Sequence, residues 1–486
     1  MTLVGCCEGP FFEVGFRARN DEMNVLLIQP AQERGLGFRS LAVVEPLGLE
    51  AVAGALPEHR IRILDLRLED PLPRVLKEFK PDFCGINCSF TIDVYQTREI
   101  AAQIKAWDQG VPVFIGGHHA SLSPLDFFQP AIDGVVIGEG ESPIRELIPV
   151  LQKGGDLQEI PGLALNRGGA MIFTPERPPS AEMDDLPIPN RESTRPYRHH
   201  YHLGFQKPFS IMETARGCPY RCDFCSVWKF FQGKCRMRTP ERVLSEIKTI
   251  REKFVFLADD NFLMSVPRAE EIARMILSNK IRKRFTFQAR SDSIVQHPKI
   301  IPLLKKAGFW KVFIGFEKIE ESAMAELNKH NSVQNNEEAL KILRANGMEV
   351  IAAFIIDPSF QASDFRRLRQ YILDRKLYSP SLTILTPLPG TELFTRVKEK
   401  LVTTNYELFD YVHAVLPTRM KLPDFYREFT ELYKTGYAWS QIGVEGTLAI
   451  LRAAFSISHL VSMKRAAWAS VEPLNYLAGH ERKSVP

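Results

Sequence analysis

Two series of short apolar segments constrain the fold of this 486-residue chain more than any other feature. In the first, which runs from Met23 to about Gly155, helical stretches alternate with the segments "NVLLIQP", "RIRILDL", "FCGINCS", "VPVFIGG" and "GVVIGEG". Such alternation predicts βαβ units and a parallel sheet covered by helices on both faces. The first series therefore predicts a doubly wound α/β domain.

The second series predicts another parallel sheet of a different kind. Its segments lie between residues 209 and 386 and read "FSIMETA", "FVFLA", "FTFQA", "KVFIG", "EVIAAFII" and "LTILT". Six strand–helix repeats predict an open partial (β/α)6 barrel, smaller than the closed eight-unit form. One of its helices is expected to begin at "TPERVLSEI", with Thr239 as N-cap and Pro240 at the first helical position.

A proline-rich stretch separates the two series. "TPERPPSAEMDDLPIPN", residues 174–190, carries five prolines and little periodicity, which is the composition of a stiff linker. Residues after about 396 are expected to be mainly helical. We therefore expect an N-terminal extension (1–22), a first domain (23–173), a linker (174–207), a partial barrel (208–395) and a helical C-terminal region (396–486).

Composition excludes several classes of protein. The net charge is only +4 and no long run of one sign occurs, so bulk charge gives no reason to expect a nucleic-acid partner. The first 30 residues lack a basic segment followed by a long apolar one, so secretion is not expected. The uncharged run Ala453–Met463 is shorter than the roughly 20 residues of a spanning helix. We expect a cytoplasmic protein that does not cross a membrane.

Three closely spaced cysteines carry the strongest chemical signal. Cys218, Cys222 and Cys225 form C-x3-C-x2-C directly after the first strand of the second series. Soft thiolates select iron–sulfur clusters or zinc. A four-iron cluster usually takes four cysteines, so three would leave one iron open to an external ligand.

A structural zinc ion is the alternative for this triplet. Cys235 or one of three histidines, His199, His200 and His202, could complete four ligands. Zinc sites, however, commonly use paired cysteines and close their coordination shell, which favours the cluster. Cys6, Cys7, Cys84, Cys88 and Cys235 are expected to be ordinary thiols, with Cys84 and Cys88 in a core strand.

The triplet resembles that of the radical S-adenosylmethionine (SAM) superfamily. C-x3-C-x2-C with an aromatic residue, Phe224, before the last cysteine lies here at the end of the first strand of a six-repeat barrel. The resemblance implies a 4Fe-4S cluster whose open iron binds SAM, and reductive cleavage of SAM to a 5′-deoxyadenosyl radical. It also implies an external electron donor, either a reductase or a flavodoxin or ferredoxin.

Further strand ends match the same family one by one. "LADDN" resembles its segment after the second strand, which makes Asp259 and Asp260 candidates to hold the amino group of SAM. Arg290, in "QARSD", could pair with a carboxylate, and Glu317, in "FIGFEK", could reach the ribose or the amino-acid end of SAM. The alternative for each is an ion pair at the barrel rim. "LTPLPGTEL" after the sixth strand also resembles the family, and its Pro389–Gly390 predicts a turn.

The first domain resembles the cobalamin-binding domains that precede such barrels. The stretch "NVLLIQPAQERG" lacks the G-x-G-x-x-G of dinucleotide folds, so nicotinamide binding is not expected. The resemblance lies in "VFIGGHHAS…DGVVIGEGE", where small residues at strand ends let the cofactor approach the backbone. It implies cobalamin contacts from the residues that follow three strands: Ser89, Phe90, Gly116, Gly117, His118, Gly138, Glu139 and Gly140.

One departure from that pattern concerns the cobalt ligand. The D-x-H-x-x-G string of domains that ligate cobalt through histidine is absent. His118 could meet the cofactor or could be a polar residue at the rim of the sheet. We expect a cobalt face without a histidine ligand.

Together these features resemble cobalamin-dependent radical SAM methyltransferases that act on sp3 carbon. Residues 403–433 are most similar to hopanoid C-3 methylases, which implies a hydrophobic triterpenoid substrate. The apolar segment 437–468 either lies in a bilayer interface, giving a peripheral contact with the inner membrane, or packs as a helix on the barrel. Two alternatives remain: a radical cyclase or methylase acting on a tetrapyrrole or other natural product, and a cobalamin-binding regulator with structural zinc.

Overall fold

The structure is a computed structural model that describes residues 21–31, 36, 42–69, 71–180, 182–378, 380–436, 465 and 467–481. The chain divides into two compact units, and each takes more than one stretch of sequence. Unit 1 comprises Met1–Ala31, Gly48–Pro179 and Pro187–Ser193; unit 2 comprises Gln32–Leu47, Ser180–Leu186 and Thr194–Pro486. Among the helices described, none is long and apolar enough to cross a membrane.

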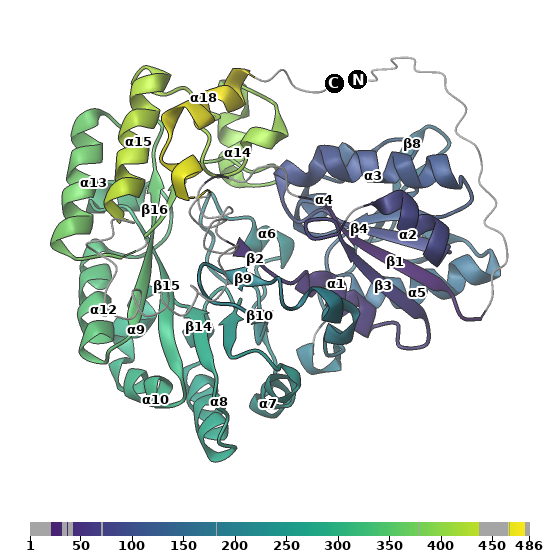
Figure 1. Ribbon diagram of the computed structural model, residues 1–486, viewed down its shortest axis with the longest axis horizontal. Helices are drawn as coiled ribbons and strands as arrows, with labels where there is room; N and C mark the ends of the chain where they lie inside the picture. The colour runs from purple at the N-terminus through teal and green to yellow at the C-terminus, as the bar shows by residue number, and fades with distance from the viewer. Residues whose placement is uncertain are drawn as a thin grey trace. The chain divides into compact units, whose positions relative to one another are not determined.

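Unit 1 is built on a seven-stranded sheet of order β3-β1-β4-β5-β6-β7-β8 (Figure 1). The five predicted strands are present and pair in parallel, because each is a short apolar run connected to the next by a helix or a long crossover. Helices α1 and α5 share an apolar core with one face of the sheet, and α3 contacts β4 and β5. The elements are β1 (Asn24–Gln29), α1 (Leu47–Gly54), β3 (Arg60–Asp65), α2 (Leu72–Phe79), β4 (Phe83–Asn87), α3 (Val94–Trp107), β5 (Val113–Gly116), α4 (His118–Leu122), β6 (Gly134–Val136) and α5 (Glu141–Lys153).

The sheet ends in a hairpin that the alternation of segments did not predict. Strands β7 (Leu163–Arg167) and β8 (Ala170–Phe173) pair antiparallel with each other, and β7 pairs antiparallel with β6. Gly168 and Gly169 form the two-residue turn, both with positive φ, which is the geometry that a tight hairpin requires. The doubly wound sheet therefore has an antiparallel edge.

Unit 2 contains the predicted partial barrel. Six strands pair in parallel in the order β10-β13-β14-β15-β16-β17, which is also their order along the chain. Thr239 caps α7 as predicted, since its hydroxyl accepts the Arg242 N–H. The elements are β10 (Phe209–Met212), α7 (Pro240–Thr249), β13 (Phe254–Leu257), α8 (Val266–Ser278), β14 (Arg284–Gln288), α9 (Ser291–Gln296), α10 (Ile301–Lys306), β15 (Phe309–Glu317), α11 (Glu321–Ala325), α12 (Val333–Ala345), β16 (Glu349–Ile356), α13 (Ala362–Asp374) and β17 (Ser381–Ile384).

One large apolar core joins the barrel strands to their helices. Buried phenylalanine rings contact one another within it: the ring of Phe309 in β15 lies 5.0 Å from that of Phe285 in β14 and 5.3 Å from that of Phe262, which follows β13. The C-terminal helices α15 (Leu422–Gly436) and α18 (Pro473–Glu481) belong to the same unit, and α15 packs against α13. The region after residue 396 is thus mainly helical where described, with α14 (Glu392–Val397) at its start, although residues 401–421 contain only the short 3-10 helix Tyr406–Leu408.

A short segment from early in the chain also belongs to unit 2. Strand β2 (Ala42–Val43) pairs antiparallel with β9 (His202–Leu203). The buried carboxylate of Glu45 accepts hydrogen bonds from the Ser210 hydroxyl (2.5 Å) and the Ile211 N–H (2.6 Å), both in β10, and pairs with Arg198 at 2.5 Å. The chain therefore contributes to the barrel before it completes unit 1.

Candidate functional site

The cysteine triplet lies in a loop at the carboxyl end of the barrel strands. Two short strands, β11 (Ala215–Arg216) and β12 (Arg236–Met237), pair antiparallel and close the loop at its base. Gly217 follows β11 with φ of +88°, and a Cβ there would lie 2.0 Å from the Lys234 carbonyl oxygen. Only glycine fits this position, so the backbone enters the loop in a conformation that other residues avoid.

The loop holds its three thiols in partly buried positions. Cys222 is buried, whereas Cys218 and Cys225 are half-buried, as is Phe224 between them. Burial raises the pKa of all three thiols, that of Cys225 to about 12. Thiols bind metal as thiolates, and a bound metal centre supplies the positive charge that favours this form. The donor set therefore fits a thiolate-bound cluster.

The zinc alternative finds no site in the described part of the chain. There, no three Cys, His, Asp or Glu side chains converge on a position that one metal ion could occupy. In a four-iron cluster each cysteine binds a different iron, so the thiols need not converge on one point. His199 and His200 are exposed and contact each other, with ring centroids 3.9 Å apart and ring planes tilted by 45°. The assignment of the triplet to a cluster stays the prediction made from its spacing.

Asp259 and Asp260, predicted as a pair, occupy two different environments after β13. Asp259 is fully buried and accepts hydrogen bonds from the N–H (2.6 Å) and hydroxyl of Thr214. It therefore connects the end of β13 to the entrance of the cysteine loop. Asp260 is half-buried and accepts the Gly217 N–H at 3.2 Å.

The electrostatic setting of Asp260 suits a cationic ligand. Burial, and then the charges of Glu213 and Asp259, raise the pKa of Asp260 to about 7. It lies close to the triplet, because the Gly217 N–H that it accepts belongs to the residue directly before Cys218. A carboxylate destabilised in this way gains from a positive group placed beside it. Asp259 is fully buried and bonded to Thr214, so Asp260 is the better candidate to bind the amino group of SAM.

Arg290 clamps the cysteine loop. Its guanidinium lies 3.7 Å from the ring centroid of Tyr220, which stands between the first two cysteines. The same group pairs with both oxygens of Asp292 (2.7 to 3.1 Å) and donates to the carbonyls of Lys329 (3.0 Å) and His330 (2.9 Å). The carboxylate that Arg290 was predicted to meet is thus supplied by the chain itself.

Glu317 ends β15 beside a lysine that the sequence did not single out. Its backbone has φ of +60°, where the register between β15 and β16 shifts. The carboxylate pairs at 2.5 Å with the amine of Lys329, which also donates to the Gly315 carbonyl at 2.5 Å. Both side chains are almost buried. Burial raises the pKa of Cys222, and the positive charge of Lys329 offsets part of that rise. Glu317 is therefore a member of an ion pair next to the triplet.

Two further segments hold the outer side of the loop. The Asn328 amide donates to the Arg221 carbonyl at 3.2 Å. Asp223 pairs with Arg396 at 2.6 Å, and its carbonyl accepts the Leu393 N–H at 3.0 Å. The predicted turn is present, with Gly390 at φ of +85° immediately before α14. None of these partners could have been assigned from the cysteine motif, because they lie more than 100 residues away.

In unit 1 the predicted cobalamin contacts follow three neighbouring parallel strands, β4, β5 and β6. Their carboxyl ends meet at one edge of the sheet, which is where such folds bind ligands. Gly117 caps α4 with φ of +116°, and a Cβ there would lie 2.7 Å from the Asn87 side chain. Phe90, which follows β4, is 46% exposed. The full set in this position is Ser89, Phe90, Gly116, Gly117, His118, Gly138, Glu139 and Gly140.

Two unpredicted residues organise this edge. The Ser121 hydroxyl donates to the Gly117 carbonyl (2.8 Å) and accepts the Gly138 N–H (2.9 Å), which ties two of the loops together. His119, the neighbour of His118, is buried, with its ring nitrogens bonded to Thr91 (3.1 Å) and Asp126 (3.0 Å), whereas His118 is half-buried. An exposed aromatic ring and a close-packed glycine backbone at the same edge of the sheet fit a large flat cofactor such as cobalamin.

Comparison with known proteins agrees with the candidate site in each unit. The chain matches the Radical SAM superfamily over residues 212–372 and the B12 binding domain over residues 34–148. It is 33% identical over 421 residues to the hopanoid C-3 methylase of Methylococcus capsulatus, covering 84% of this chain and 80% of that one. It is 24% identical over 361 residues to the anaerobic magnesium-protoporphyrin IX monomethyl ester cyclase of Rubrivivax gelatinosus, covering 72% and 64%.

A solved structure shares the fold. The cobalamin-dependent SAM radical enzyme OxsB, with aqua-cobalamin and SAM bound, matches with a TM-score of 0.68 at 16% identity, covering 91% of this chain and 72% of that one. At this identity the match concerns the fold alone. The predicted order of a cobalamin-binding domain followed by a radical SAM barrel is confirmed.

Proposed function

Because this chain belongs to the cobalamin-dependent radical SAM methyltransferases, which bind a 4Fe-4S cluster, SAM and cobalamin, we propose that it methylates a triterpenoid lipid. The proposed substrate is a hopanoid, and the proposed methylated carbon is C-3. The observation that carries this proposal is the 33% identity to a hopanoid C-3 methylase over 84% of the chain. It extends through both cofactor domains and beyond the cysteine motif, which all radical SAM enzymes share.

We assign the cofactor contacts as follows. Cys218, Cys222 and Cys225 hold the cluster, and Asp260 meets the amino group of SAM. The loops after β4, β5 and β6 hold cobalamin. When bound, the cluster and SAM supply a hydrogen-abstracting radical, and cobalamin supplies the methyl group.

The chain's own residues position and shield this chemistry. The Arg290 guanidinium lies over the ring of Tyr220 and is itself held by ionic hydrogen bonds to Asp292, which are stronger than neutral ones. Lys329 and Glu317 form a nearly buried pair beside Cys222, so water has little access on that side. A radical needs this exclusion of water and this fixed geometry more than it needs an acid or a base.

Deletion of the gene in a hopanoid-producing strain tests the substrate. Lipid mass spectrometry should show that 3-methyl triterpenoids disappear and return on complementation. A lipid profile that does not change would refute the hopanoid assignment. Purified, reconstituted protein should release 5′-deoxyadenosine together with methylated product.

The similarity to a protoporphyrin ester cyclase supports a second candidate, a radical cyclase or tetrapyrrole enzyme of the same architecture. A cyclase consumes SAM without transferring its methyl group. SAM labelled in the methyl carbon separates the two, because only a methyltransferase places the label in the product.

A further inference from the structure

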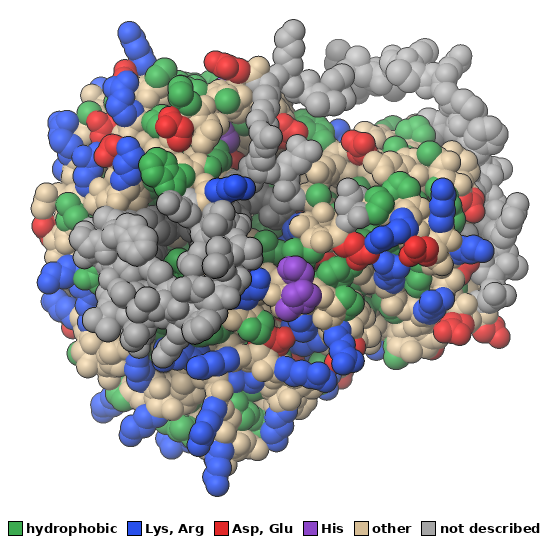
Figure 2. Space-filling model, viewed as in Figure 1, with side chains coloured by type: hydrophobic (Ala, Val, Ile, Leu, Met, Phe, Trp, Pro, Cys, Tyr) green, Lys and Arg blue, Asp and Glu red, His purple; other side chains and the backbone are tan. Residues whose placement is uncertain are grey.

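The barrel has a strongly basic face at the amino ends of its strands. We define the amino-end face as the five segments that lead into β13–β17, namely residues 248–253, 279–284, 305–311, 344–349 and 374–378. They contain thirteen Lys and Arg but only three Asp and Glu, although the whole chain carries a net charge of +4. In Figure 2 Lys and Arg side chains gather over the part of the barrel where α8 and α10 lie in Figure 1.

Most of this charge faces solvent and is not neutralised locally. Lys280, Arg282 and Lys306 are exposed and form no ion pair with any side chain that the structure describes. Of the three acidic residues, Glu252 is buried against Arg198 (3.4 Å) and Glu349 pairs with Lys311 (2.8 Å). The face therefore presents a positive potential that attracts anionic surfaces.

Exposed apolar side chains lie among these cations. Leu277 is 40% exposed three residues before Lys280, at the end of α8. Leu373 (42%) and Tyr378 (46%) flank the cations that follow α13. Basic residues next to exposed leucines are typical of surfaces that bind lipid headgroups and insert apolar groups beneath them.

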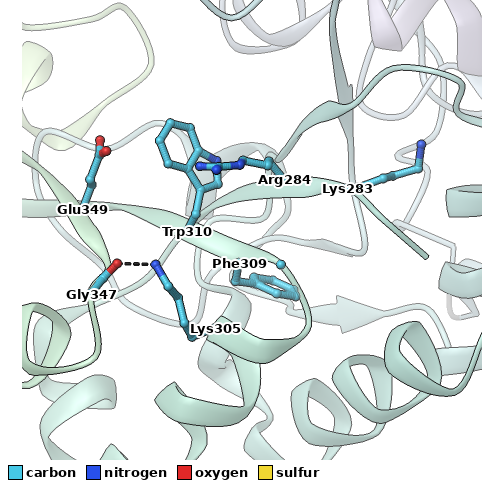
Figure 3. Close-up of a pocket in the computed structure, with 8 residues that line it drawn as sticks. Lys283, Arg284, Lys305, Phe309, Trp310, Gly347 and Glu349 are labelled. Carbon is cyan, nitrogen blue, oxygen red and sulfur yellow. Dashed lines mark hydrogen bonds between the residues drawn. The ribbon is translucent and has the colours of Figure 1, made fainter. Parts of the chain in front are cut away.

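A cavity of about 430 Å³ opens within the same face (Figure 3). The Arg284 guanidinium lies 5.0 Å from the ring centroid of Trp310 at its edge. Lys305 donates one hydrogen bond, to the Gly347 carbonyl, and an ammonium has three donors. The lining residues Lys283, Arg284, Lys305, Phe309, Trp310 and Glu349 thus provide more positive than negative charge and room for a phosphate group.

We propose that the amino-end face docks the enzyme on bilayers of anionic phospholipid. Anionic phospholipid is favoured over nucleic acid because the exposed leucines have a partner in a bilayer but none along a phosphate backbone. The inference rests on charge and exposure alone, and it deepens the proposed function by holding the enzyme where a triterpenoid substrate resides. The cysteine loop is at the opposite end of the strands and stays on the solvent side.

Vesicle sedimentation of the full chain tests the proposal. The protein should bind vesicles of phosphatidylglycerol mixed with phosphatidylcholine, and added salt should weaken the binding. At about 1 kcal/mol per cation near an anionic surface, the triple variant Lys280→Glu, Arg282→Glu, Lys306→Glu should bind about a hundredfold more weakly. Thermal unfolding and SAM binding should match those of the unaltered protein.

A matched variant controls for total charge. Arg366→Glu, Arg427→Glu and Lys434→Glu change three exposed cations on α13 and α15, outside the amino-end face, and should leave vesicle binding within about twofold. Both variants keep residues 437–466, so any effect of that segment is the same in each. Equal binding by both variants, equal binding to pure phosphatidylcholine, or tighter binding to RNA than to vesicles would overturn the proposal. Because no substrate is present, a negative result leaves the methyltransferase assignment untouched.

Discussion

The two ends of the barrel use charge in opposite ways. The segments that leave the strands at the carboxyl end, residues 213–226, 258–265, 289–293, 317–332, 357–361 and 385–391, contain ten Asp and Glu and five Lys and Arg. The amino-end face has thirteen cations and three acids. An excess of carboxylates suits SAM, which carries a positive sulfonium, whereas an excess of exposed ammonium and guanidinium groups suits an anionic surface.

The difference extends to how the cations are held. At the carboxyl end Arg290 and Lys329 are buried and paired with Asp292 and Glu317. Such pairs fix geometry because breaking one leaves a buried charge without a partner. At the amino end the cations are mostly exposed, where individual pairs contribute little to stability. The carboxyl end of the barrel fixes the positions of side chains, and the amino end creates a positive electrostatic potential.

The largest expected effect is at the carboxyl end. Cys222→Ala should abolish cluster binding, with iron content near zero and no cleavage of SAM, because only two thiolates remain. Iron analysis and 5′-deoxyadenosine assays measure both. Cys235→Ala is the control and should keep its iron; a loss there equal to that in Cys222→Ala would make Cys235 a fourth ligand of the cluster and contradict an open iron.

Arg290→Met should be the next most damaging change. It leaves the half-buried carboxylate of Asp292 without its cationic partner and removes the guanidinium from the ring of Tyr220, so we expect a loss of about 3 kcal/mol in unfolding free energy. Iron content after reconstitution should fall with it. Urea unfolding measures the first effect. Arg274→Met, at an exposed pair with Glu270, should change neither, and iron content that survives intact in Arg290→Met would reduce Arg290 to an ordinary rim ion pair.

Asp260→Asn should weaken SAM binding and at the same time raise the stability of the SAM-free protein. The pKa of Asp260 is raised from 3.8 to about 7, so in the SAM-free protein its ionisation lowers stability as pH rises between those values. The variant should therefore unfold at a higher temperature at pH 8. It should also bind SAM about tenfold more weakly at that pH, because a charge-assisted contact is lost.

The pH dependence of SAM binding checks the same residue. In the unaltered protein the affinity should decrease as pH falls below about 7, when the carboxylate is protonated. Asp260→Asn should show a flat profile over this range in isothermal titration calorimetry. Equal slopes in the two proteins would assign the SAM amino group to another residue.

The smallest expected effect is at the amino end. Glu349→Ala removes one of the three acids there and frees Lys311. The exposed pair contributes little to stability, so the melting temperature should stay within about 2 °C. Affinity for anionic vesicles should rise a few-fold. Weaker vesicle binding would argue against a field that attracts anions.

Much of the fold could be predicted because strands and helices are local. All eleven predicted strands are present, since each is a short apolar run with clear ends. The hairpin β7–β8 also had a local signal, the "NRGGAM" between two apolar runs, which an expectation of βαβ units overlooked. The domain boundaries drawn from composition stay a prediction.

Contacts between residues far apart in the sequence limit how much of the site could be predicted. Sequence cannot separate Asp259 from Asp260, because burial against Thr214 decides their roles. Lys329 and Asn328 lie more than 100 residues from the cysteines that they support. The amino-end face could not be predicted for a related reason. Its cations come from five separate segments, and the net charge of the chain combines them with the acidic excess of all other residues. The membrane-interface interpretation of residues 437–468 falls mostly outside the described residues.

The early segment with β2 and Glu45 bears on how genes of this kind can recombine. A crossover at the proline-rich stretch would exchange the upstream module as one block. The downstream barrel would then lose the Glu45 carboxylate. This carboxylate pairs with Arg198 and accepts hydrogen bonds from Ser210 and Ile211 in β10. A viable hybrid must inherit residues 42–47 together with the barrel, so the two modules are expected to be transmitted as a linked pair.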